Sequence, residues 1–214
     1  MTEAARVDAQ HQAGKLTARE RIALLLDPGS LEEFDLRVRA PGDERNADAA
    51  ATGGDGVVTG RGTVNGRPVF VYAKDFTEQG GSLAATHARR ITDVQDRALA
   101  CRAPIVGLFD SRGARLGAGV AALEGYGEIL RRHVEASGVI PQIAVVMGPC
   151  VGPEAHSPSL CDFSFMVRDT SHLFLSGPDV VQAVTHETVT ADDLGGALVH
   201  ATRSSVAEDR KSVV

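Results

Sequence analysis

The sequence has no tryptophan, and aromatic residues make up only 4% of its 214 residues. Its core must therefore be built from Ala, Val, Leu and Ile, within a hydrophobic share of 43%. It also has no excess of basic residues, since its formal net charge is -6. Because nucleic acid is bound by clustered Lys and Arg, this balance argues against nucleic acid as the main partner. The length suits one large domain or two small ones.

Long apolar runs and paired cysteines are also missing. The longest apolar runs, such as residues 104–109 and 139–147, are too short and interrupted to cross a membrane. Cys101, Cys150 and Cys161 are odd in number and lack paired spacing, and no hydrophobic leader precedes them. We therefore expect a cytoplasmic protein whose cysteines are small buried hydrophobic residues. The scattered histidines and cysteines predict no metal site.

A helix is predicted near the N-terminus. Apolar residues recur at helical spacing over about residues 13–26, and Thr17 with Glu20 forms a plausible capping box. The sequence Asp-Pro-Gly at residues 27–29 then ends the helix. Residues 40–54 contain Pro, Gly, Asp, Asn and a run of Ala without periodicity, which predicts a mobile loop.

Strands and helices alternate along the rest of the chain. Asn65-Gly66 stands between two Val-rich runs, which is a strong hairpin signal. Further strands are predicted at residues 105–109, 143–147, 163–167 and 173–176, and helices at about 83–102 and 119–137 and near Pro178 and Ala191. This alternation predicts an α/β core that binds ligands at the carboxyl ends of its strands.

The most informative segment is the glycine-rich stretch Met147–Pro158, predicted as a turn after the strand at 143–147. Such a turn aims backbone N–H groups at one point in space, which is the geometry of an oxyanion hole. Pro153 has no N–H and removes one possible donor. Glu154 and His156 instead bring groups that can accept and deliver protons.

Motifs spread along the chain carry a resemblance to a known family. They are Gly14–Arg21, Gly54–Gly60, Lys74–Thr77, Gly80–Leu83, Tyr126–Ile129, Ser137–Gln142, Leu175–Val181 and Leu194–Ala197. Together they resemble the carboxyltransferase (β) subunit of biotin-dependent acyl-CoA carboxylases, especially the propionyl-CoA carboxylase type. The resemblance implies an α/β, crotonase-like (ClpP/crotonase) fold of stacked β-β-α units with an N-terminal helical extension. We place the extension and mobile loop at residues 1–46, and a single carboxyltransferase N-terminal domain at residues 47–214.

The resemblance covers only the first of the family's two halves. In that family the active site lies between the N-terminal half of one subunit and the C-terminal half of another. The first half chiefly holds the acyl-CoA and the second chiefly holds biotin. The resemblance therefore implies a coenzyme A thioester as substrate, biotin on a carrier domain, a separate chain that supplies the C-terminal half, and a trimeric or hexameric ring.

Two turns are similar to the family's contributors to the thioester site. In the first, residues 110–115, Arg112 stands where the family has a glycine. The second, residues 148–158, departs at three positions, since Pro153 replaces a glycine, Glu154 an alanine and His156 a tyrosine. The predicted catalytic residues are Gly113, Ala114, Gly152, Glu154 and His156. The predicted substrate-binding residues are Gly80, Gly81, Ser82, Ser111, Arg112, Arg115, Pro153 and Ser157.

Several of these residues also have structural interpretations. His156 could fill the space and hydrogen bond of a tyrosine, and Glu154 could cap a helix. Arg112 and Arg115 could lie on the surface, pair with Asp110 or contact a coenzyme A phosphate. Gly80 and Gly81 could mark a tight turn, and His87 could be structural.

Three functional hypotheses follow. The first is the acyl-CoA-binding half of a carboxyltransferase, which stabilises the thioester enolate during carboxyl transfer from carboxybiotin. The second is a biotin-independent decarboxylase or related enzyme that acts on coenzyme A or acyl-carrier-protein thioesters, with Glu154 or His156 as acid or base. The third is a non-catalytic pseudo-subunit. A lost oxyanion donor costs about 2.7–4 kcal/mol of transition-state stabilisation, whereas acid–base catalysis contributes a factor of about 10²–10⁴ in rate.

Overall fold

The strands β2 (Val57–Val64) and β3 (Arg67–Lys74) form the predicted hairpin across Asn65-Gly66. The two turn residues have φ of 50° and 73°, the positive values for which Asn-Gly is selected. The computed structural model describes residues 2–34 and 55–211. The predicted mobile loop at residues 40–54 and the domain boundary at residue 46 lie outside these ranges.

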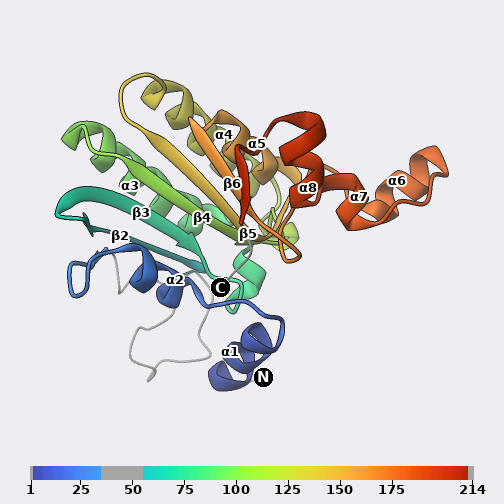
Figure 1. The fold of residues 1–214 in the computed structure, drawn as a ribbon, viewed down its shortest axis with the longest axis horizontal. Helices are drawn as coiled ribbons and strands as arrows, with labels where there is room; N and C mark the ends of the chain where they lie inside the picture. The colour runs from blue at the N-terminus through green and yellow to red at the C-terminus, as the bar shows by residue number, and fades with distance from the viewer. Residues whose placement is uncertain (1, 35–54, 212–214) are drawn as a thin grey trace.

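The hairpin is part of a mixed sheet in the order β1-β2-β3-β4-β5-β6-β8, with β7 paired to β5 (Figure 1). The other strands are β1 (Glu32–Glu33), β4 (Ile105–Ser111), β5 (Gln142–Val151), β6 (Phe163–Val167), β7 (His172–Phe174) and β8 (Asp209–Lys211). All pairings from β3 to β8 are parallel. Parallel pairing places the carboxyl ends of β4, β5 and β6 at one edge of the sheet.

Helices cover both faces of this sheet. The long helices α3 (Ala85–Cys101) and α4 (Val120–Ala136) pack against one face, while α2 (Ala18–Leu25) packs against β2 and β3 on the other (Figure 1). Side chains that alternate along β3 divide between two cores, with Tyr72 beside α3 and Val71 beside α2. The alternation of strands and helices was thus correctly predicted.

The N-terminal prediction was partly wrong. There are two helices, α1 (Glu3–Gln12) and α2, rather than one over residues 13–26. They are separated at Gly14, which has a φ of 71°. The capping box of Thr17 and Glu20 is confirmed, and it starts the helix at Ala18.

The predicted end of the strand at residue 147 was also wrong. β5 continues to Val151, because β4 pairs Ser111 with Cys150 on one side and β7 pairs with residues 149–151 on the other. Gly148 is therefore a strand residue, and a Cβ at this position would clash with Asp110 Oδ1. The turn itself is the short 3-10 helix η4 (Gly152–Ala155), followed by α5 (His156–Leu160).

The C-terminal part extends beyond the sheet edge. It contains α6 (Pro178–Thr185), α7 (Ala191–Gly195), α8 (Ala197–Val199) and η5 (His200–Ser204). α6 has no buried residue and projects from the body of the molecule (Figure 1). The pairing of β8 with β6 was not predicted, because the tail is polar and has no strand pattern. Among the described residues, no helix combines the length and apolar character required to cross a membrane.

Candidate active site

Three segments meet at the carboxyl edge of the parallel sheet: η2 (Gln79–Gly81), the turn after β4, and η4. Leu83 forms an isolated bridge with Ala114. A Cβ at Gly81 would lie 2.5 Å from the Asp110 carbonyl oxygen, and one at Gly113 would lie 2.5 Å from that of Val151. The structure thus brings together all three groups of predicted site residues, and backbone packing requires these two glycines.

The turn after β4 is held by backbone hydrogen bonds. The Arg112 N–H donates to the Gly80 carbonyl at 3.0 Å, and the Gly113 N–H donates to Ser111 Oγ at 3.0 Å. The Arg115 N–H donates to the Leu83 carbonyl at 2.9 Å. Within residues 2–34 and 55–211, nothing accepts the Ala114 N–H. Ala114 is therefore a donor in this turn without an acceptor among the described residues.

Arg115 is occupied within the protein. Its guanidinium donates to Asp55 Oδ1 at 2.6 Å and to the Ser82 carbonyl at 2.9 Å. Ser82 is itself buried and donates to the Gln79 carbonyl at 2.7 Å. These contacts connect the start of β2 to η2 and the first turn, so Arg115 and Ser82 have structural partners. Their substrate-binding role stays a prediction.

Arg112 has a different environment. It is exposed, and its guanidinium lies over the Phe76 ring at 5.2 Å from the centroid. A Cβ at Gly80 would lie 2.9 Å from the Arg112 side chain, so this glycine makes room for it. No carboxylate in the described part of the chain pairs with Arg112. Arg112 is thus an exposed cation at the site without an ion-pair partner among the described residues.

The alternative in which Asp110 pairs with Arg112 or Arg115 is wrong. The Asp110 carboxylate is fully buried and accepts from Lys15 Nζ at 2.9 Å, Arg21 Nη2 at 2.8 Å and Gln10 Nε2 at 2.9 Å. All three donors come from the N-terminal extension, which was predicted only as a helical addition. The signal that could have revealed this contact is Arg21, a charged residue beside the apolar positions of its helix.

The second turn has an open side. Gly152 has a φ of 69°, and no heavy atom of the described residues lies within 4 Å of the position that a Cβ would occupy. Pro153 lies in the first turn of η4, where its missing N–H is tolerated. His156 is exposed and its imidazole makes no hydrogen bond to another described residue, so the ring does not replace a tyrosine hydrogen bond there. Ser157 is 2% exposed and lies beneath this surface.

Glu154 is turned inward. Its side chain is 1% exposed and forms an ion pair with Lys74 at the end of β3, which is 2% exposed. No side chain of the described residues, Glu154 included, caps η4 or α5, so the helix-capping interpretation of Glu154 is wrong. A carboxylate that is buried and paired has no open path to a substrate. The sequence could not reveal this partner, because the pairing spans 80 positions of the chain.

Burial controls the titration of the groups around this ion pair. Burial, with a smaller contribution from Glu154, raises the pKa of the Cys150 thiol well above its usual range. Burial, reinforced by Lys74, keeps the pKa of His87 well below its usual range. Neutral His87 donates from Nδ1 to the Asp55 carbonyl at 2.7 Å, which agrees with the structural interpretation. Cys150 is thus an inert buried thiol.

The other cysteines differ from Cys150. Burial raises the pKa of the partly buried Cys161 to about 12. Cys101 is exposed, so the expectation that every cysteine is buried was wrong. It occupies the last position of α3, where the helix leaves the core. No group of three metal-ligating side chains occurs among the described residues.

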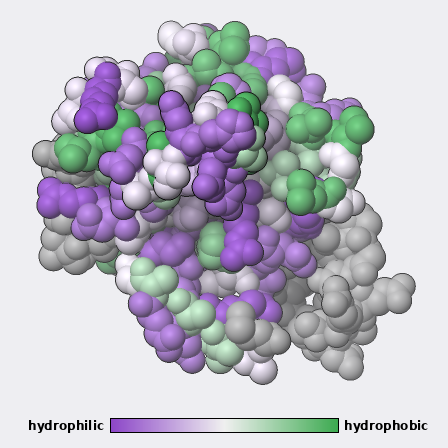
Figure 2. Space-filling view, turned by 90° about the vertical axis from the view of Figure 1, so that its right-hand side faces the viewer, coloured by the Kyte–Doolittle hydropathy of each residue, from purple (hydrophilic) through white to green (hydrophobic). Residues whose placement is uncertain are grey.

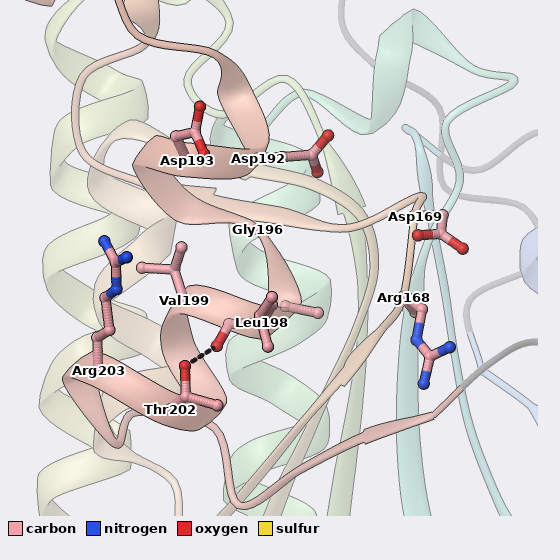
Figure 3. Close-up of a pocket in the computed structure, with 10 residues that line it drawn as sticks. Arg168, Asp169, Asp192, Asp193, Gly196, Leu198, Val199, Thr202 and Arg203 are labelled. Atoms are coloured by element: carbon pink, nitrogen blue, oxygen red, sulfur yellow. Dashed lines mark hydrogen bonds between the residues drawn. The ribbon is translucent and has the colours of Figure 1, made fainter.

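A pocket of about 600 Å³, lined by no residue of the turns, lies between the loop after β6 and α7, α8 and η5 (Figure 3). Two of its three acidic residues have internal partners: Asp192 meets His172 at 3.1 Å, and Asp193 accepts from Thr190 at 2.7 Å. Figure 2 faces this end of the molecule, where hydrophobic patches stand between hydrophilic ones. The exposed Leu175, Val180, Val184 and Leu198 belong to this part of the chain. The sequence pattern did not predict the pocket.

Comparison with known proteins places the chain in a family. The carboxyl transferase domain model matches residues 9–210, and the chain therefore belongs to the carboxyl transferase domain family. This confirms the resemblance and the crotonase-like α/β fold predicted from the motifs. The chain is 57% identical over 203 residues to the propionyl-CoA carboxylase beta chain of Cereibacter sphaeroides. That match covers 95% of this chain but only 40% of the relative's length.

Solved structures show the same likeness. Transcarboxylase 12S, a hexamer solved with methylmalonyl-coenzyme A and methylmalonic acid bound, has a TM-score of 0.89 and 43% identity. This match covers 95% of the present chain and 40% of the other. The MdcD-MdcE hetero-dimer of Pseudomonas malonate decarboxylase has a TM-score of 0.75 and 26% identity, covering 92% of this chain and 79% of the other.

Proposed function

We propose that this chain is the acyl-CoA-binding half of an acyl-CoA carboxylase carboxyltransferase. It would stabilise the thioester enolate during carboxyl transfer, together with a separate chain that supplies the C-terminal half. The observation that carries the proposal is that, in this member of the family, the turn after β4 contacts the turn η4. The available Ala114 N–H and the open side of Gly152 lie in turns that touch where Gly113 meets the Val151 carbonyl.

The proposed chemistry requires donors for a developing negative charge. Enolate formation moves charge onto the thioester oxygen, and backbone N–H groups fixed in advance stabilise it without reorganising. Ala114 is the donor that we assign to this oxygen. Pro153 contributes none, so the second turn would contribute shape and access through Gly152. Arg112 would contact a phosphate of coenzyme A, because its guanidinium is exposed and pairs with no carboxylate of the described residues.

A separate partner chain is supported by the comparison with known proteins and by exposed apolar residues on the surface of this chain. The chain matches 40% of a propionyl-CoA carboxylase beta chain but 79% of a chain in the malonate decarboxylase hetero-dimer, so this fold can be divided between chains. Leu116, Val120 and Leu123 follow the first turn and are 94%, 79% and 57% exposed. Contiguous exposed apolar residues indicate an interaction surface. Biotin on a carrier would deliver the carboxyl group, and the residues of this chain would hold the thioester within an oligomer.

The test has a binding arm and an assembly arm. Isothermal titration with propionyl-CoA should show binding that Arg112→Ala weakens, whereas Arg131→Ala on the exposed side of α4 should leave it unchanged. Purification from native cells should recover a second crotonase-like chain. A solitary homo-oligomer without such a partner would contradict the divided carboxyltransferase.

A biotin-independent decarboxylase is the second candidate, and the likeness to malonate decarboxylase favours it. Because Glu154 is buried against Lys74, exposed His156 is the better acid or base. This candidate predicts turnover of malonyl or methylmalonyl thioesters, on coenzyme A or a carrier protein, without biotin. His156→Ala should abolish that turnover; an unchanged rate in His156→Ala would exclude this assignment. The cytoplasmic location and the pseudo-subunit hypothesis remain predictions.

A further inference from the structure

We propose that Lys74 is a positioning residue for the candidate site. Through its ion pair with Glu154, it fixes η4 and therefore the open side of Gly152. Its importance for thioester binding rests on the proposed function, but its effect on the turn does not. The pair joins the last residue of β3, in the middle of the sheet, to the centre of the turn.

Each charge of the pair depends on the other. Within the described residues, no hydrogen bond reaches Lys74 Nζ, Glu154 Oε1 or Glu154 Oε2. The Lys74 ammonium also lies 5.7 Å from the centroid of the Tyr126 ring on α4, which adds a weaker attraction. Removing either charge would leave the other buried and uncompensated, a situation that proteins avoid by moving the group or exposing it to water.

The surroundings of the pair are polar and incompletely satisfied. The Tyr126 hydroxyl and His87 Nε2 are buried and have no hydrogen-bond partner among the described residues. Lys74 influences His87 electrostatically, and Glu154 influences Tyr126, so these groups share one region behind the turn. Neutral His87 cannot donate to a lone Glu154 carboxylate, because it already uses its Nδ1–H on the Asp55 carbonyl, and the Tyr126 hydroxyl supplies at most one neutral hydrogen bond in place of a positive charge.

Apart from this ion pair, the turn is held by the buried Ala155, which packs in the hydrophobic core. Among the described residues, nothing fills the Cβ position of Gly152 and no side chain caps η4 or α5, while Pro153 donates no backbone hydrogen bond. His156 is exposed. Among the charged side chains of residues 152–157, Glu154 is therefore the buried anchor. Because this anchor lies inside the protein, Lys74 and Glu154 act on a ligand through the backbone of the turn.

Hydrogen–deuterium exchange without ligand tests this role. The chain would be compared with Lys74→Met, Glu154→Gln and the double variant. We expect each single variant to exchange about tenfold or more faster at residues 150–157, with the β2–β3 hairpin unchanged. The exchange rate of the double variant should lie between the wild-type rate and the rate expected if the two single effects multiplied, because no lone charge remains buried. Arg131→Met, which breaks exposed pairs on α4, is the matched control and should leave residues 150–157 unchanged.

Two results would overturn the proposal. One is wild-type exchange at residues 150–157 in both single variants. The other is faster exchange of equal size in the hairpin, which would show a general loss of stability. If the single variants do not fold, the double variant decides, since wild-type exchange at the turn in a folded double variant also overturns the proposal.

Propionyl-CoA titration separates this inference from the proposed function. We expect the single variants that loosen the turn to bind propionyl-CoA about tenfold more weakly, and the double variant to recover part of the affinity. If the wild type binds no thioester but the exchange pattern is as expected, the proposed function fails and the positioning role stands. If the wild type binds propionyl-CoA and the turn exchanges identically in every variant, the positioning role fails.

Discussion

Arg21 Nη2 lies 2.8 Å from Asp110 Oδ2, and the two side chains are 3% and 0% exposed. This pair connects α2 in the N-terminal extension to the last buried strand residues before the first turn. The extension is therefore part of the support of the candidate site. Lys15 strengthens the connection, since its ammonium contacts the same carboxylate and the Phe76 ring.

Arg21→Met should strongly destabilise the protein, because it leaves part of the Asp110 charge without its partner in a buried position. We expect a loss of about 3–5 kcal/mol in the free energy of unfolding, measured by urea denaturation. Arg19→Met is the control on the same helix, since the Arg19–Glu33 pair is 42% and 13% exposed. That variant should lose only about 0–1 kcal/mol. Equal losses would contradict the special role of Arg21.

Gly148→Ala should destabilise the chain by about 1–3 kcal/mol, because the added Cβ clashes with Asp110 Oδ1 in the middle of the sheet. Gly127→Ala on α4 is a control of the same chemistry. No atom of the described residues lies within 4 Å of its Cβ position, and alanine favours a helix over glycine by about 0.8–1 kcal/mol. Thermal unfolding should therefore shift in opposite directions in the two variants, and a matching shift would refute this account of Gly148.

Leu116→Ser with Val120→Ser should weaken association with the proposed partner chain and leave the stability of this chain nearly unchanged. Both side chains are exposed, so their replacement loses little packing within the chain. Quantitative co-purification measures the association, and thermal unfolding measures stability. Leu24→Ser, also at a highly exposed leucine but on α2, is the control. Full recovery of the partner with the double variant would place the interface elsewhere.

The free energy of unfolding should fall as the pH drops below about 6.5, the pKa of an unperturbed histidine. Burial lowers the pKa of His87 and, against its hydrogen bond with Gln142, that of His133. The unfolded chain therefore binds protons at a pH where the folded chain does not, so these groups favour folding above pH 6.5 and lose this contribution below it. Urea unfolding from pH 7.5 to 5.5 measures the slope. His87→Gln should reduce it, and an unchanged slope would show that His87 titrates equally in both states.

Sequence patterns predicted the elements that are determined by residues adjacent in the sequence. The hairpin follows from Asn65-Gly66, and the start of α2 follows from Thr17 and Glu20, because turn and cap geometry depend on neighbouring residues. The length of β5 did not follow, since its last residues are held by β4 and β7. Periodicity within the apolar run could not show that pairing.

The same distinction applies to the candidate site. The motifs identified the residues that meet there, because the family resemblance located both turns. They did not show which side chains face outward. Glu154 looked like an acid or base beside His156, yet its environment is decided by Lys74 far away in sequence. Whether a carboxylate faces a substrate or a lysine depends on tertiary packing, which no short motif encodes.

The close approach of Gly113 to the Val151 carbonyl has a mechanical consequence. The two turns touch through their backbones, without a flexible side chain between them to absorb displacement. A ligand that displaces one turn must therefore displace the other, so the two turns behave as one rigid unit. A displacement of either turn, caused by substrate or by mutation, should change the geometry of both turns.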